Sequence, residues 1–221
     1  MKKILLSVHP KYCKLIFNSE KTIEVRKSAP KIDPPFEVLI YCTTPKERWS
    51  VGHQIFFNDT LYTLPTGELK LGDALELRAD WLGKYDENNF LNGKVIGSFI
   101  CDKIYSFITY GAGAACIDSN FNQIPTERVI KETCLTEQQL MDYFERGIGN
   151  YEGYGWYITE PKLFDKSREL SEFSVYGKCA EECSEYDICM KYDSVESRFE
   201  CPDFTRMLLK RAPQSWCYVD D

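Results

Sequence analysis

The residues best suited to chemistry lie in one short N-terminal segment, residues 21–27. Lys21 supplies a mobile ammonium, and Arg26 supplies a planar guanidinium that matches a phosphate or the edge of a base. Glu24 lies two residues before Arg26, where its carboxylate can hold Arg26 in place or accept from the amino group of a base. The segment therefore indicates a cleft for an anionic or nucleotide-like ligand, and the alternative is a purely structural ion pair between Glu24 and Arg26.

The order of residue types over residues 22–26 predicts a strand that sorts these groups by face. Ile23 and Val25 alternate with Thr22, Glu24 and Arg26. Successive side chains of a strand point to opposite sides of the sheet. We therefore expect Ile23 and Val25 in the core, with the three polar side chains on the other face.

Aromatic residues offer stacking surfaces for such a ligand. They make up 14% of the chain, a share that favours a β-rich fold because aromatic side chains suit strands. Tyr41, Trp156 and Trp216 are candidates to stack on a base. The alternative is that these three rings belong to the hydrophobic core.

The elements that must position these residues are mostly strands. A helix is predicted from Pro10, which suits a first helical turn. A second is predicted over residues 136–146, where Thr136 and Gln139 form a capping box and Gly147 ends the helix. Without regular strand–helix alternation, the pattern favours an α+β fold in which helices flank a β-barrel. Strands are predicted at residues 4–8, 22–26, 36–43, 93–105, 155–164 and 212–219, with a loop at 110–115.

Several stretches, in chain order, resemble the ASCH family of the PUA-like superfamily. They are residues 6–12 (LSVHPKY), 15–27 (LIFNSEKTIEVRK), 38–43 (VLIYCT), 93–102 (GKVIGSFICD) and 211–219 (RAPQSWCYV), the last similar to the closing strand of phage-type and bacterial members. The resemblance implies one ASCH-type PUA-like β-barrel over residues 1–221. It also implies a variable insertion at 49–92 and a Cys-rich acidic insertion at 171–203, after which the chain returns to the barrel at 212–219.

The resemblance also implies a function, because the cleft between barrel and first helix in such domains is thought to hold RNA or a modified nucleotide. The ligand-binding residues expected here are Lys21, Thr22, Glu24, Arg26, Tyr41, Trp156 and Trp216. One similar branch contains small bacterial amidohydrolases that act on acetylated cytidine, through a Lys, a Thr nucleophile and a distant Glu. The nucleophile position corresponds to Glu24, and a carboxylate is a poor substitute for an activated hydroxyl. Binding is therefore expected rather than catalysis; in a hydrolase the catalytic candidates are Lys21, Thr22 and Glu24.

Four of the ten cysteines gather in the acidic segment and suggest a possible structural zinc. Their spacing meets half of the usual pattern, because Cys179 and Cys183 fit one zinc knuckle whereas Cys189 and Cys201 do not form a second. The alternatives are free thiols or an insertion packed by its own aromatic residues. The four are Cys179, Cys183, Cys189 and Cys201. Five others are expected as buried free thiols: Cys13, Cys42, Cys101, Cys116 and Cys134.

Charge is uneven along the chain, whose formal net charge is −7. Residues 1–50 hold ten basic and five acidic residues, which suits an anionic ligand; the alternative is ordinary solubilising charge. Residues 180–203 hold eight acidic and two basic residues, which suits a protein partner better than nucleic acid. A protein-interaction module is therefore a third candidate function. Since no stretch is long and apolar enough to span a bilayer and no signal-cleavage site follows the start, we expect a cytoplasmic protein without a membrane partner.

Overall fold

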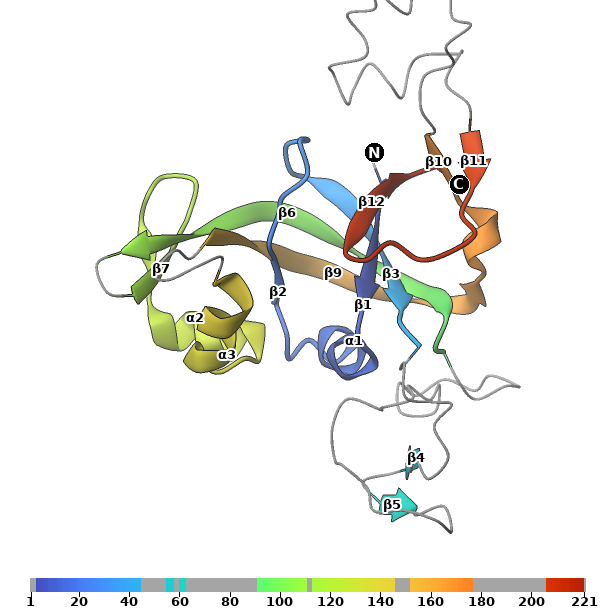
Figure 1. The fold of residues 1–221 in the computed structure, drawn as a ribbon, viewed down its shortest axis with the longest axis horizontal. Helices are drawn as coiled ribbons and strands as arrows, with labels where there is room; N and C mark the ends of the chain where they lie inside the picture. The colour runs from blue at the N-terminus through green and yellow to red at the C-terminus, as the bar shows by residue number, and fades with distance from the viewer. Residues whose placement is uncertain are drawn as a thin grey trace, which may run out of the picture.

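The described residues combine a mixed sheet with three short α-helices, as the sequence predicts for an α+β protein (Figure 1). The computed structural model describes residues 3–44, 55–57, 60–62, 91–110, 113–145, 152–176 and 206–220. None of the helices in these ranges reaches the length and hydrophobicity needed to cross a membrane. The predicted zinc ligands, and nearly all of the acidic segment, lie outside the described residues.

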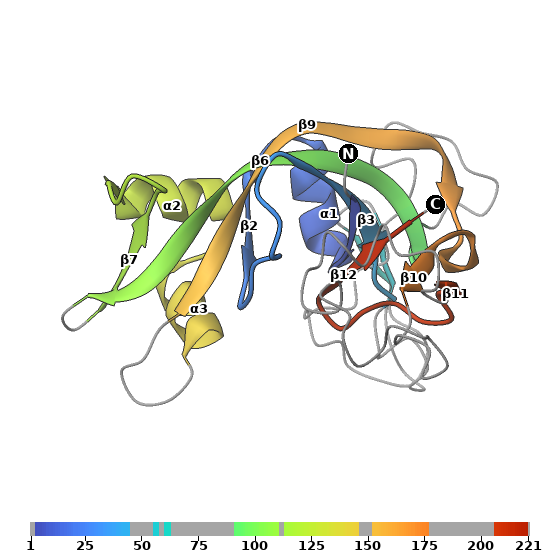
Figure 2. The same ribbon diagram turned by 90° about the horizontal axis from the view of Figure 1, so that it is seen from above.

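Eight strands form the main sheet, and the two longest bind it together. β6 (Lys94–Tyr110) and β9 (Glu152–Arg168) run antiparallel to each other across the molecule (Figure 2). β1 (Lys3–Val8) pairs in parallel with β3 (Phe36–Cys42) and antiparallel with β12 (Trp216–Val219), so the two ends of the chain lie side by side. The remaining members are β2 (Ile23–Arg26), β7 (Gly113–Ile117) and β8 (Gln123–Ile124).

The sheet is open, so the prediction of a closed barrel is wrong in this respect. Within the described residues, β2 pairs with β9 alone, and no strand pairing joins it to β1. At this opening the guanidinium of Arg26 reaches across from β2, and its Nη2 donates to the main-chain oxygen of Ser7 at 2.7 Å. A side chain thus satisfies a carbonyl that a neighbouring strand satisfies in a closed barrel.

Two of the three helices begin where the sequence predicts. α1 (Pro10–Phe17) begins at Pro10, and α3 (Glu137–Phe144) begins after Thr136, whose capping box with Gln139 is present. α3 ends at Phe144, two residues before the predicted end. α2 (Thr126–Thr133) had no sequence signal, because the stretch TERVIKET has few apolar residues. A short 3₁₀ turn, η3 (Leu170–Glu172), follows β9.

The hairpin of β6 and β7 occupies much of the stretch for which a loop is predicted. β6 continues to Tyr110 and β7 starts at Gly113, because the two strands pair with each other up to these residues. Tyr110 and residues 113–115, for which a loop is predicted, therefore belong to the paired strands β6 and β7. Two short pairs lie apart from the main sheet: β4 (Ile55–Phe57) with β5 (Thr60–Tyr62), and β10 (Ser174–Tyr176) with β11 (Arg206–Leu208).

The strand alternation is confirmed over β2, residues 23–26, whereas Thr22, the first residue of the predicted strand, lies just before it. Ile23 and Val25 pack with Phe107 and Phe144 in the core beneath α2 and α3. Four of the five cysteines expected to be buried are buried free thiols. Cys134 is partly exposed because it follows α2 in the left-handed conformation, with φ of 54°.

Buried thiols make the fold sensitive to alkali. Burial raises the pKa of Cys101 and Cys116 from 9.0 to about 12, and that of Cys217 to about 11. Between pH 9.0 and a pH of about 12, the unfolded chain releases thiol protons that the folded chain retains. We therefore expect stability to fall as pH rises from about 9 towards about 12. Urea unfolding of the reduced protein at several pH values checks this, and the fall should become shallower in a Cys101→Ala/Cys116→Ala variant.

Candidate ligand-binding site

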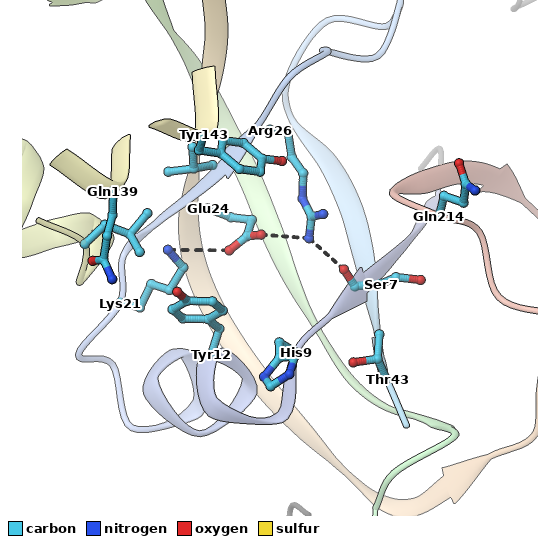
Figure 3. A pocket seen from close by; sticks show the side chains of 12 residues that line it. Ser7, His9, Tyr12, Lys21, Glu24, Arg26, Thr43, Gln139, Tyr143 and Gln214 are labelled. Atoms are coloured by element: carbon cyan, nitrogen blue, oxygen red, sulfur yellow. Dashed lines mark hydrogen bonds and ion pairs between the residues drawn. The ribbon is translucent and has the colours of Figure 1, made fainter. Parts of the chain in front are cut away.

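A pocket of about 380 Å³ lies at the opening of the sheet (Figure 3). Its walls come from three consecutive elements, the end of β1, α1 and β2, and from two parts much later in the chain, α3 and the loop before β12. The volume lies at the lower end of the range of small-molecule sites, roughly 300–1,000 Å³. The lining residues are Ser7, His9, Tyr12, Lys21, Glu24, Val25, Arg26, Thr43, Leu135, Gln139, Tyr143 and Gln214.

Lys21 is held at the inner wall of this pocket with only 2% of its surface exposed. Its Nζ donates to the main-chain oxygen of Thr133 at 2.7 Å, so it binds the C-terminal end of α2, where a positive charge is favourable. The same Nζ lies 3.6 Å from Oε2 of Glu24 and 5.1 Å from the centre of the Tyr12 ring. Burial lowers the pKa of Lys21, and the nearby Glu24 carboxylate opposes that shift.

Glu24 and Arg26 project from β2 to the same side because they are two residues apart on a strand. Arg26 Nη2 lies 2.7 Å from Oε1 of Glu24 and donates to Ser7 O at the same distance. Both residues are buried, with whole-residue exposures of 5% and 9%, yet both line the pocket. The ion pair considered from the sequence is therefore present, and it lies in a ligand-sized cavity.

One donor in this network has no partner. Nε of Arg26 is buried and makes no hydrogen bond to any described residue. A buried, unsatisfied N–H costs about 1–3 kcal/mol, so an acceptor that enters the pocket and reaches this atom recovers that cost. Both carboxylate oxygens of Glu24, in contrast, already face a cation: one faces Lys21 and the other faces Arg26.

Two tyrosines and two lysines lie around the mouth of the pocket. Tyr12 of α1 has Lys11 Nζ 5.5 Å from its ring centre, and Tyr143 of α3 has Lys27 Nζ at 5.2 Å. Tyr143 is 36% exposed, so its ring is accessible at the surface. Burial raises the pKa of Tyr143, and the nearby Arg26 opposes this shift.

Most of the residues that line the pocket outside residues 21–26 are not among those predicted from the sequence. Gln139 and Tyr143 are four residues apart on α3 and therefore share one helical face, a spacing that could have paired them. Gln139 also accepts from the main-chain N–H of Thr136 at 2.9 Å, so the helix cap fixes its orientation. No local pattern joins α3 to residues 21–26.

The other sequence candidates are not among the residues that line this pocket. Thr22 makes main-chain hydrogen bonds to Glu132 and Ile158 and is not among the lining residues. Trp156 is fully buried, and Nε1 of the partly buried Trp216 donates to Oγ of Ser28 at 3.1 Å. Tyr41 is partly buried and packs against the core cluster that contains Leu39 and Phe173.

Metal ligands do not gather in the described part of the chain. No group of three or more His, Cys, Asp or Glu side chains there is arranged to hold an ion. The four cysteines considered for zinc lie outside the described residues, so zinc stays a prediction from the sequence.

Comparison with known proteins gave structural likenesses only. No protein-family profile matches the sequence, and no curated protein matches it. The structure is similar to the crystal structure of ASCH from Zymomonas mobilis, with 18% identity, a TM-score of 0.43 and coverage of 76% of this chain and 74% of the other. A point-mutant form of that protein gives 17% identity, a TM-score of 0.41 and coverage of 77% of each chain. These structures carry the name of the family that the sequence resembles.

Proposed function

We propose that this pocket binds one nucleotide unit, either as part of an RNA or as a free, modified nucleotide. The observation that carries the proposal is the buried Lys21–Glu24–Arg26 network in a cavity of about 380 Å³. Buried ionisable groups in a cavity are more common at functional sites than in ordinary cores. The cavity suits a single small unit rather than a length of folded nucleic acid.

The mouth of the pocket supplies the other features that a nucleotide needs. Tyr12 and Tyr143 present aromatic rings on which a base can stack, a contact worth about 1–3 kcal/mol per base. Lys11 and Lys27 are exposed beside these rings and can attract the phosphates of neighbouring nucleotides. Stacking does not depend strongly on base identity, so selection among bases falls to the polar side chains further inside.

A binding experiment with short single-stranded RNA tests this proposal. Fluorescence anisotropy at about 50 mM and about 200 mM salt should show binding that weakens with salt and is competed by mononucleotides. Tyr12→Leu should weaken binding about ten-fold through the lost stacking. Lys166→Gln, an exposed lysine towards the far end of β9, is the matched control and should bind as the unmodified protein does. RNA binding that Tyr12→Leu and Tyr143→Leu together leave unchanged would place the site elsewhere.

A second candidate is an amidohydrolase of acylated cytidine-type nucleosides, and the position of Lys21 in the cavity beside Glu24 favours it. Burial lowers the pKa of Lys21, which makes the neutral amine more accessible as a base. Glu24 stands where the nucleophilic Thr is expected, and both of its oxygens face cations. In this version Lys21 therefore activates a water molecule, and Thr22 takes no part because it does not line the pocket.

Acetate release separates the two functions. A hydrolase should release acetate from N4-acetylcytidine, and Lys21→Met should abolish the release while the fold, followed by circular dichroism, persists. Turnover that survives Lys21→Met would exclude this mechanism. Tight nucleotide binding without any acetate release would support the binding function and exclude the hydrolase.

A further inference from the structure

The inner wall of the pocket carries more positive than negative charge. Its formally charged lining contains two cations, Lys21 and Arg26, and one carboxylate, Glu24, while His9 also lines the pocket and is counted as neutral at pH 7. The α2 C-terminus offsets part of the Lys21 charge through the Thr133 carbonyl, but a helix end supplies at most about half an elementary charge. Among the described residues that line the pocket, no second carboxylate balances the set.

The donors on this wall are also incompletely used. An ammonium carries three N–H groups, and Lys21 directs one to Thr133 O and one towards Glu24. Arg26 uses Nη2 for Glu24 and Ser7, whereas its buried Nε has no partner among the described residues. Lys21 and Arg26 therefore each keep a donor that is not used within the described residues.

Exposure distinguishes the inner end from the mouth. The Lys21, Glu24 and Arg26 side chains are almost fully buried, whereas Tyr143 is a third exposed and Lys11 and Lys27 are exposed. A ligand group that reaches the cations therefore occupies a pocket that Tyr12 and Tyr143 also line. A neutral base carbonyl can satisfy a donor, but only an anion also balances the buried charge.

We propose that the inner end of the pocket is an oxyanion subsite that takes the terminal phosphomonoester of a nucleotide, with the base at the mouth against Tyr12 and Tyr143. The proposal rests on the nucleotide-binding function above and adds its orientation. Because Lys21 and Arg26 are almost fully buried in a cavity of about 380 Å³, a phosphodiester inside a chain would have to bring its next nucleotide into the same small space. The site therefore selects a mononucleotide or a phosphorylated RNA end over an internal position.

Calorimetry with matched ligands tests the subsite on the intact protein. The panel is adenosine and uridine, their 5′- and 3′-monophosphates, inorganic phosphate, acetate, and one short RNA with and without a terminal phosphate. We expect at least one monophosphate isomer to bind about ten-fold or more tightly than its nucleoside, and inorganic phosphate to compete with it. Arg26→Gln should remove this preference, and Lys166→Gln should keep it.

Each of the other outcomes of this experiment overturns a specific part of the proposal. Equal affinity for nucleosides and monophosphates overturns the phosphate subsite and leaves nucleotide binding intact. Binding of inorganic phosphate without any nucleoside, nucleotide or RNA overturns the nucleotide function and keeps the oxyanion subsite. Acetate that competes as well as phosphate overturns the assignment to phosphate. The comparison of ligands on the unmodified protein decides these cases even if Arg26→Gln fails to fold.

Discussion

Glu24→Gln is expected to destabilise the protein by ~3–5 kcal/mol, because it removes the one carboxylate that separates two buried cations. Gln has nearly the same shape, so the loss is electrostatic rather than steric. Lys21 and Arg26 then lie in the same buried wall without the negative charge that faces both of them. Urea unfolding at neutral pH measures the change in free energy.

The same charge effect also predicts how the stability of the Glu24→Gln variant depends on pH. Glu24 normally raises the pKa of Lys21 against the effect of burial, so its loss lowers that pKa further. A lysine whose folded pKa lies below its unfolded value costs stability while it is charged, and that cost disappears as pH rises towards the unfolded value of 10.5. The difference in stability between variant and unmodified protein should therefore shrink with rising pH.

Glu37→Gln provides the matched control. Glu37 is also a strand glutamate paired with a lysine, since its Oε2 lies 3.8 Å from Nζ of Lys3, but its side chain is 22% exposed against 7% for Glu24. A pair nearer to solvent is worth about 0–1 kcal/mol, so this variant should unfold almost as the unmodified protein does. Similar losses in both variants would show that burial of the Glu24 network is not the cause.

Trp156→Ala is expected to cost ~3–5 kcal/mol, because the ring fills the centre of the main core. Trp156 has 0% exposure and packs edge-on against Phe36 and Trp216, with ring centres 5.8 Å apart in each case. It is also the cross-strand neighbour of Glu24, so it lies on the same side of the sheet as that carboxylate. Removal of the ring leaves a cavity in the core beside the candidate site. Urea unfolding again gives the magnitude.

Trp156→Phe distinguishes a core role from a stacking role. Nε1 of Trp156 is buried without a partner among the described residues, so Phe loses no hydrogen bond. We expect a smaller loss of stability than for Ala and an unchanged affinity for the mononucleotide that binds best. A ten-fold or greater loss of affinity in a stable Trp156→Phe protein would instead assign Trp156 to the ligand.

The sequence by itself was sufficient for the local features of the site. Alternation over residues 22–26 separated Ile23 and Val25 from Glu24 and Arg26, because a strand has a fixed two-residue period. The capping box at Thr136 and Gln139 located the start of α3, because its hydrogen bonds join residues three apart. Each of these rules operates within a few residues of chain, so the sequence displays it directly.

Tertiary structure alone decided what surrounds those residues. Lys21 is buried because it binds the carbonyl of Thr133, 112 residues later, at the end of a helix that the sequence did not reveal. Tyr143 and Gln214 reach the pocket from α3 and from the loop before β12, while Trp156 was taken into the core. The opening between β1 and β2, which makes the pocket, depends on which strands find partners across the whole chain. Such contacts are set by long-range packing, for which no short pattern of residues carries a signal.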